Sequence, residues 1–145
     1  MNKMQLKFLS RSENEIFARN AVAAFALSLN PTLSELSDVK TAVSEAVTNC
    51  IVHGYADKEG WITVDCTVDG DCLHIQISDS GKGIADVEQA TQPFFTTLEG
   101  EERSGMGFTI MQTFMSGFSV QSKEGVGTTV SMSKHFGAKA EADAR

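Results

Sequence analysis

The chain has few residues of the kinds that cross-link or kink a fold: three cysteines and two prolines among 145 residues. Because the cysteine count is odd and no C-x-x-C spacing occurs, a disulfide framework is not expected. We expect Cys50, Cys66 and Cys72 to be small buried hydrophobic residues. A zinc site that includes Cys50 and His53 is the less favoured alternative.

Long apolar runs and basic residues are also scarce. No segment approaches the roughly 20 apolar residues that span a bilayer, and the N-terminal residues lack the apolar stretch of a signal peptide. Lys and Arg number 12 against 19 Asp and Glu, which gives a formal net charge of -7. A protein of this charge repels phosphate backbones and anionic membranes. We therefore expect a cytoplasmic protein with no direct nucleic-acid or membrane binding and a protein partner that presents a basic surface.

The length and the apolar content set the number of domains. A chain of 145 residues with 41% hydrophobic residues can bury one core and is too short for two domains of ordinary size. We expect one domain over residues 1–136. Residues 137–145 are small or charged with nothing to bury, so we expect a disordered tail.

The periodicity of the apolar residues predicts alternating strands and helices. Capping boxes of the type Ser/Thr-x-x-Glu predict helix starts at Ser12 and Thr32, and Gly54 is expected to close the second helix in the left-handed conformation. Residues 81–105 have little periodicity beyond a short helical piece at 85–90, which is typical of a functional loop. The expected strands are 4–8, 61–68, 73–79, 118–122 and 128–133, and the expected helices are 13–29, 33–53 and 106–115.

A glutamate and an asparagine lie four residues apart on the second expected helix. At about 100° per residue, the apolar residues of this helix fall on one face, and Glu45 and Asn49 lie together on the opposite side. We expect both side chains to point into one pocket. The alternative for an isolated pair of this kind is a solvated polar face.

An aspartate followed by two glycines ends the strand 73–79. Strict alternation places Asp79 on the apolar side, where a carboxylate is costly to bury unless it is hydrogen-bonded. The exocyclic amino group of adenine is a suitable donor, and Gly81 and Gly83 would let the backbone approach a flat ring. An ordinary turn is the alternative.

A second pair of glycines, Gly105 and Gly107, lies at the entry to the third expected helix. Flexible glycines before a helix expose backbone N–H groups and the positive end of the helix dipole, which together favour an anion such as phosphate. An ordinary helix entry is the alternative. Thr128, in the expected turn of the last hairpin, would add a hydroxyl near a bound base, although a plain hairpin turn explains it nearly as well.

In this order and spacing, the four segments resemble the N, G1, G2 and G3 boxes of the GHKL ATPase and kinase superfamily, whose domain is the Bergerat fold. The resemblance covers about residues 4–135 and is strongest to bacterial anti-sigma factors that are also serine kinases. The segments that carry it are 44–49, 53–55, 93–97 and 102–111. It implies an α+β fold, a two-layer α/β sandwich with a mixed, mostly antiparallel sheet, helices on one face, and ATP between the helices and a lid.

The resemblance also implies roles for individual residues. Asn49 would bind Mg²⁺, Asp79 would accept a hydrogen bond from the adenine of ATP or ADP, and Glu45 would be the catalytic base toward a substrate serine. Gly81, Gly83 and Thr128 would line the adenine ring. The lid would contact the phosphates through Thr97, Arg103, Ser104, Gly105 and Gly107.

Partners are implied as well. Glu15 and Arg19 would dock a sporulation sigma factor and, in competition with it, the anti-anti-sigma protein that the kinase phosphorylates; an exposed ion pair is the alternative. The first strand would pair across a homodimer. Two other functions stay open: a non-catalytic, nucleotide-dependent protein that sequesters the sigma factor, and a detached ATPase domain of a histidine kinase. Glu45 favours the kinase, because a pure binding protein needs no carboxylate there.

Overall fold

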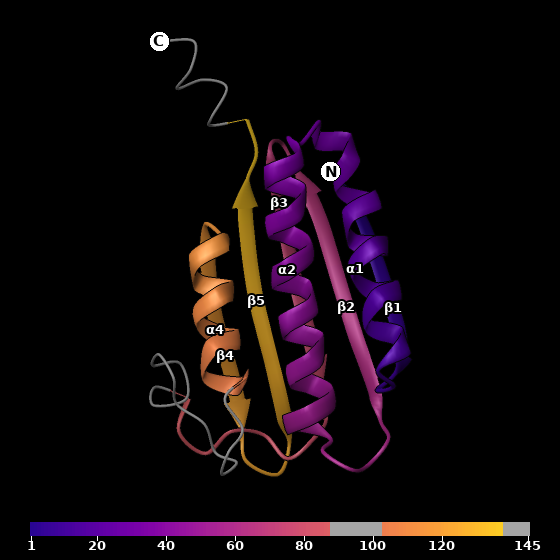
Figure 1. The fold of residues 1–145 in the computed structure, drawn as a ribbon, viewed down its shortest axis with the longest axis vertical. Helices are drawn as coiled ribbons and strands as arrows, with labels where there is room; N and C mark the ends of the chain where they lie inside the picture. Colours follow the sequence, from indigo (N-terminus) through magenta and orange to yellow (C-terminus); the bar gives the residue numbers. More distant parts are fainter. Residues whose placement is uncertain (88–102, 138–145) are drawn as a thin grey trace.

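A five-stranded sheet carries helices on one of its faces (Figure 1). The computed structural model describes residues 1–87 and 103–137, without the side chains of 103–106. The strand order is β1-β2-β3-β5-β4, and all four pairings among the described strands are antiparallel. The expected α/β sandwich with a mostly antiparallel sheet is thus confirmed. The strands are β1 (Asn2–Leu9), β2 (Trp61–Asp69), β3 (Cys72–Asp79), β4 (Gly117–Lys123) and β5 (Gly127–His135).

The helical layer contains α1 (Glu13–Ala26), α2 (Leu33–Asn49) and α4 (Arg103–Phe114). Figure 1 shows α2 along the middle of the sheet, with α1 and α4 on either side of it. No helix among the described residues has the length and apolar content that crossing a membrane requires. Because α2 contacts both of its neighbours, residues on its flanks can share sites with α1 on one side and with α4 on the other.

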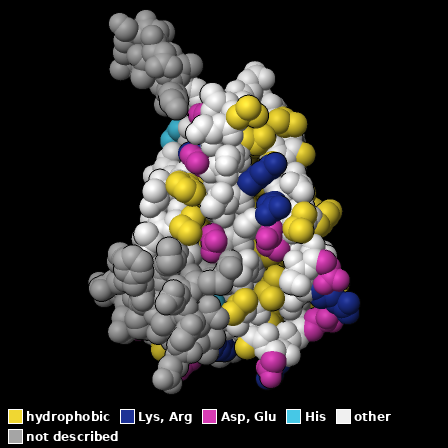
Figure 2. Space-filling view, viewed as in Figure 1, with side chains coloured by type: hydrophobic (Ala, Val, Ile, Leu, Met, Phe, Trp, Pro, Cys, Tyr) yellow, Lys and Arg dark blue, Asp and Glu magenta, His cyan; other side chains and the backbone are white. Residues whose placement is uncertain are grey.

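The outer surface of the helical layer is not uniformly polar. In Figure 2, hydrophobic side chains lie beside basic and acidic ones on this face of the molecule. Two large apolar residues of α1, Ile16 and Phe17, are 51% and 53% exposed. They stand next to Glu15 and Arg19 in the sequence, so α1 presents charged and apolar groups together.

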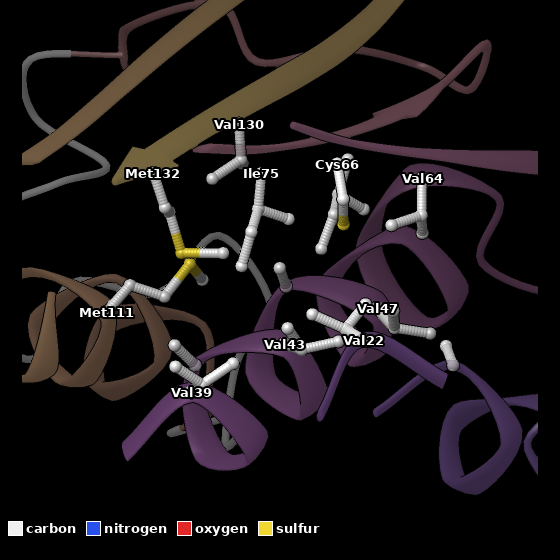
Figure 3. Close-up of a cluster of buried hydrophobic side chains, with 14 of the residues drawn as sticks. Val22, Val39, Val43, Val47, Val64, Cys66, Ile75, Met111, Val130 and Met132 are labelled. Atoms are coloured by element: carbon white, nitrogen blue, oxygen red, sulfur yellow. The ribbon is translucent and has the colours of Figure 1, made fainter. Parts of the chain in front are cut away.

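The hydrophobic core lies between the helices and the sheet (Figure 3). Met111 of α4 and Met132 of β5 point toward one another across the two layers. Side chains of this size each contribute about 1.5–3 kcal/mol when they are fully buried. The other labelled core residues are Val22, Val39, Val43, Val47, Val64, Cys66, Ile75 and Val130.

The two expected capping boxes have different outcomes. At Thr32, the hydroxyl accepts from the Glu35 N–H at 3.1 Å and the Thr32 N–H donates to the Glu35 carboxylate at 2.9 Å, so this box is confirmed. At Ser12 the prediction is wrong, because Ser12 has helical backbone angles and its side chain makes no cap hydrogen bond. The Glu15 carboxylate instead accepts from the Ser44 hydroxyl at 3.1 Å. The carboxylate that the capping box required is therefore hydrogen-bonded to a residue of α2.

The second helix ends differently from the prediction. α2 is followed by a π-helical turn, η2 (Cys50–Gly54), in which the Tyr55 N–H donates to the Cys50 carbonyl at 2.9 Å. Ala56, with a φ of 55°, takes the left-handed conformation that we expected at Gly54. Gly54 is needed for another reason, its close approach to Asp79, which is described below.

The third helix begins earlier than expected. It starts at Arg103, so Gly105 and Gly107 lie within its first turns and not in a loop before it.

The first helix is followed by a 3₁₀ turn, η1 (Leu27–Leu29), and Asn30 ends this turn in the left-handed conformation, with a φ of 52°. The expected helical piece at 85–90 and the expected tail at 137–145 fall largely outside the described residues.

The capping boxes allow a direct test of these assignments. Thr32→Ala should lower the free energy of unfolding by about 1 kcal/mol, because the Glu35 N–H loses its partner. Ser12→Ala is the matched control and should change stability by less than about 0.5 kcal/mol. Chemical denaturation of both variants measures this, and equal losses would contradict the assigned caps.

Candidate functional site

A cavity of about 370 Å³ lies beside the C-terminal end of α2, over β3 and β5. Its size falls in the range of about 300–1,000 Å³ that is typical of small-molecule sites. Four of the predicted site residues line it: Asn49, Asp79, Gly83 and Thr128. Residues from the helix, both strands and the loop after β3 therefore share one space. The other lining residues include Ala46, Cys50, His53, Ile77, Lys82, Ile84, Phe108 and Val130.

Asp79 places its carboxylate on the helix side of the sheet, as strand alternation predicted. Its neighbour two residues earlier, Ile77, is fully buried and lines the same cavity. Burial raises the pKa of the Asp79 carboxyl above the ordinary value, and hydrogen bonds from the Gly81 N–H, the Cys50 thiol and the Thr128 backbone oppose part of this rise. The Gly81 bond measures 2.9 Å at Oδ1. The Gly81 N–H from the turn thus holds the carboxylate, and Cys50 and Thr128 lie near it in the same cavity.

Gly54 is the residue that lets η2 approach this carboxylate. A Cβ at position 54 would lie 2.8 Å from both Cγ and Oδ2 of Asp79, a distance that real Cβ atoms essentially never show. On the other side, the Gly54 carbonyl accepts from the Lys82 N–H at 2.9 Å. A glycine therefore joins the end of the helix to the turn after β3 across the Asp79 side chain.

Glu45 and Asn49 meet next to α4. A Cβ at Gly107 would lie 3.2 Å from Asn49 Nδ2 and 3.3 Å from both Asn49 Oδ1 and Glu45 Oε2. The two side chains therefore converge on one point, where the missing side chain of Gly107 leaves room for them. Asn49 Nδ2 is buried and has no hydrogen-bond partner among the described residues.

Glu45 does not line the cavity that contains Asp79. It lines a second, polar groove of about 410 Å³ between α1 and α2, together with Glu15 and Arg19. Arg19 and Glu15 form the ion pair that the sequence allowed, at 3.5 Å, and Glu15 also holds Ser44. Asn49 faces the cavity and Glu45 faces the groove, so this pair stands at the boundary between the two spaces. The other groove residues are Asn20, Ser37, Lys40, Thr41, Ser44 and Thr48.

Thr128 lies directly opposite Asp79 in the register of β3 and β5. Its hydroxyl is 2.7 Å from the Ser122 hydroxyl, which in turn accepts from the Ile84 N–H at 2.7 Å. Ser122 thus joins Thr128 to the loop after β3. Sequence reasoning missed Ser122, and it treated Cys50 as a buried apolar residue, with a zinc site as the less favoured alternative. A thiol one position after Asn49, on a helix facing a core-side carboxylate, was the available signal for Cys50.

Part of the predicted site cannot be placed. Thr97 lies outside the described residues, and of Arg103, Ser104 and Gly105 only the backbone is described, within α4. Gly81 and Gly107 border the site through the contacts given above. The roles assigned to the predicted residues stay predictions.

Comparison with known proteins agrees with this architecture. Residues 9–134 match a family described as the histidine kinase-like ATPase domain. Among solved structures, the RsbU and RsbW domains of a Mycobacterium tuberculosis protein superpose with a TM-score of 0.67 at 16% identity, covering 94% of this chain and 32% of that one. A histidine kinase domain from Erythrobacter litoralis gives 0.58 at 21% identity, covering 77% and 49%. At these identities the structural similarity shows the fold alone, and the family match over residues 9–134 places the chain in the histidine kinase-like ATPase class.

More similar relatives narrow the class. The chain is 57% identical over 136 residues to the anti-sigma F factor of Thermoanaerobacter sp. (strain X514), covering 94% of this chain and 95% of that protein. It is 52% identical over 135 residues to the anti-sigma F factor of Clostridium acetobutylicum, covering 93% and 94%. The chain belongs to the anti-sigma F factor family.

The contact between Gly54 and Asp79 predicts the effect of a methyl group. Gly54→Ala should lower the free energy of unfolding by about 1–3 kcal/mol, because the new Cβ forces the carboxylate or η2 to move. In an Asp79→Ala background the same change should cost less, since the shorter side chain leaves space. A double-mutant cycle by chemical denaturation measures the coupling, and an equal cost in both backgrounds would show that the clash lies elsewhere.

Proposed function

We propose that this chain is an anti-sigma factor and an ATP-dependent, Mg²⁺-dependent protein serine kinase. With ATP bound it holds a sporulation sigma factor inactive, and it phosphorylates the anti-anti-sigma protein that would release that factor. The observation that carries the proposal is the meeting of Glu45 and Asn49 at Gly107, on the boundary between the Asp79 cavity and the polar groove. A nucleotide and a protein substrate could then approach one point from two sides.

The Asp79 cavity suits the nucleotide. In this proposal the Asp79 carboxylate accepts from the adenine amino group, and Gly81, Gly83 and Thr128 lie along the base. Burial and apolar lining such as Ile77 favour a flat ring, and the donors already on Asp79 keep the carboxylate oriented. ADP would bind through the same contacts.

Asn49 is suited to hold the metal ion. Mg²⁺ prefers oxygen ligands, and Asn49 Oδ1 is an amide oxygen beside Gly107 in a place where the Nδ2 atom of the same side chain has no described partner. An unpaired buried N–H donor is costly, and the Nδ2 atom supports a hydrogen-bond acceptor, such as a phosphate oxygen of the nucleotide, next to the metal ion. When bound, Mg²⁺ neutralises charge on the phosphates. The lid residues Thr97, Arg103, Ser104 and Gly105 are proposed to contact the phosphates.

Glu45 is proposed as the general base. The serine hydroxyl of the substrate would approach from the groove, and Glu45 Oε2 would take its proton while the serine oxygen bonds to the γ-phosphorus and the bond to the ADP oxygen breaks. Glu45 lines the groove and also reaches the Asn49 side, so it can act at the junction. A base in this role contributes a factor of about 10²–10⁴ to the rate.

Partner binding is proposed for α1. Glu15 and Arg19 line the groove, and the exposed Ile16 and Phe17 beside them add apolar area of the kind that protein interfaces bury. The sigma factor and the anti-anti-sigma protein would compete for this surface. A homodimer through β1 is also proposed, because β1 is an edge strand of the described sheet and pairs on one side only among the described strands.

The base assignment is tested by Glu45→Gln, which keeps the shape and removes the proton acceptor. Phosphotransfer from labelled ATP to the serine of an anti-anti-sigma protein should fall by about 10²-fold or more, while ATP affinity stays within about twofold. Phosphoserine formation and calorimetric ATP titration measure the two effects. If the variant phosphorylated the substrate at the rate of the unmodified protein, Glu45 would not be the base. If the unmodified protein formed no phosphoserine, the kinase proposal would be wrong.

The adenine assignment is tested by Asp79→Asn. ATP affinity at neutral pH should fall about tenfold or more, because a charged acceptor is replaced by a neutral one. The pKa of Asp79 is raised, so the unmodified protein should lose affinity as the pH falls through that value, whereas the variant should lack this component. Calorimetry across pH gives the ATP affinities of the unmodified protein and of Asp79→Asn. Their ratio is independent of the protonation of ATP, which affects both proteins equally. A ratio that does not change with pH would contradict the role of Asp79.

A further inference from the structure

The loop after β3, which forms one wall of the Asp79 cavity, is hydrogen-bonded to the β4–β5 hairpin at two points. Lys82 and Ile84 of this loop line the cavity. The Gly125 N–H donates to the Lys82 carbonyl at 2.6 Å, and the Ile84 N–H donates to the Ser122 hydroxyl at 2.7 Å. The first bond joins two backbones, whereas the second depends on a single side chain.

The Ser122 hydroxyl uses its whole hydrogen-bonding capacity at this point. A hydroxyl has one proton and two lone pairs. Ser122 Oγ donates to the Gly127 carbonyl at 3.0 Å and accepts from the Ile84 N–H. This leaves one lone pair for the Thr128 hydroxyl, which is 2.7 Å away. Because Thr128 and Ile84 both line the cavity, one side chain of β4 holds two parts of the cavity wall.

Gly83 brings the loop within reach of this side chain. It has a φ of 73°, which favours glycine, and a Cβ at this position would overlap the Lys123 carbonyl. The backbone of the loop therefore lies directly against the end of β4. Ser122, the residue before Lys123, can then bond the Ile84 N–H on the other side of Gly83.

We propose that Ser122 is a positioning residue of the nucleotide site, which holds the Thr128 hydroxyl and the Ile84 backbone at the wall that borders the adenine ring. The inference rests on the nucleotide binding proposed above. Ser122 does not itself line the cavity, so it acts through these two residues. A wall that is already fixed spares the ligand the cost of ordering it, which strengthens binding.

The first test removes the hydroxyl. In Ser122→Ala the Ile84 N–H loses its acceptor, so hydrogen exchange at this amide should accelerate by about threefold or more in the free protein. The Gly125 amide keeps its bond to Lys82 and serves as the internal reference. Mg-ATP should bind roughly three- to tenfold more weakly. Exchange followed by NMR and calorimetric titration measure the two effects.

Two further readouts separate positioning from a general loss of structure. The KM for ATP should rise roughly three- to tenfold in Ser122→Ala while kcat stays within about twofold, because contacts with the ring are the same before and during phosphoryl transfer. Ser122→Thr keeps the hydroxyl on a β-branched side chain that suits a strand, so it should restore both the affinity and the KM.

Ser119→Ala is the matched control. Ser119 also lies on β4, but it is exposed and on the opposite face of the sheet, so every readout should stay as in the unmodified protein. Unchanged Mg-ATP affinity in Ser122→Ala, or weak binding that Ser122→Thr does not restore, would overturn the positioning role alone. If the unmodified protein bound no Mg-ATP, the proposed function would fail and this inference with it.

Discussion

The site depends on one constraint, the placement of a carboxylate on the core side of a sheet. Asp79 follows Ile77 along the buried face of β3, where a charge is costly unless donors surround it. The Gly81 N–H binds the carboxylate from the turn after β3, and Gly54 approaches the same group from the end of α2. Gly54 has no Cβ because that meeting leaves no space for one. The shape of the cavity therefore follows from the needs of one acidic group.

A second feature divides the site into two parts. Asn49 faces the cavity and Glu45 faces the groove, yet atoms of both lie close to where a Gly107 side chain would be. A single turn of α2 thus separates two spaces and presents an oxygen to each. This arrangement suits the phosphoryl transfer proposed above, because donor and acceptor must meet in line at one point while the rest of each molecule stays apart.

Periodicity was enough to predict the layers, the strands and the burial of Asp79, since these depend on local alternation of apolar residues. Local patterns gave the wrong cap at Ser12, the wrong helix end at Gly54 and the wrong helix start near Gly105. At Ser12, the Glu15 carboxylate does not complete the capping box and instead accepts from Ser44, which lies 29 residues away. Gly54 approaches Asp79, which the sequence does not place beside it. The helix start at Arg103 lies before both glycines, so they do not mark the helix entry. Local rules fail at these positions because tertiary partners satisfy the same groups better.

The failures cluster around the site, and this has a physical reason. A binding site must leave some polar groups incompletely paired so that a ligand can pair them, as with the orphaned Nδ2 of Asn49. The surrounding backbone must then hold a costly arrangement that no local preference favours. The π-helical turn at residues 50–54 is one such departure, and π turns inside helices are frequent at functional sites. This turn brings Gly54 against the Asp79 carboxylate and places Cys50 in the same cavity, so the irregular end of α2 shapes the space around the acid.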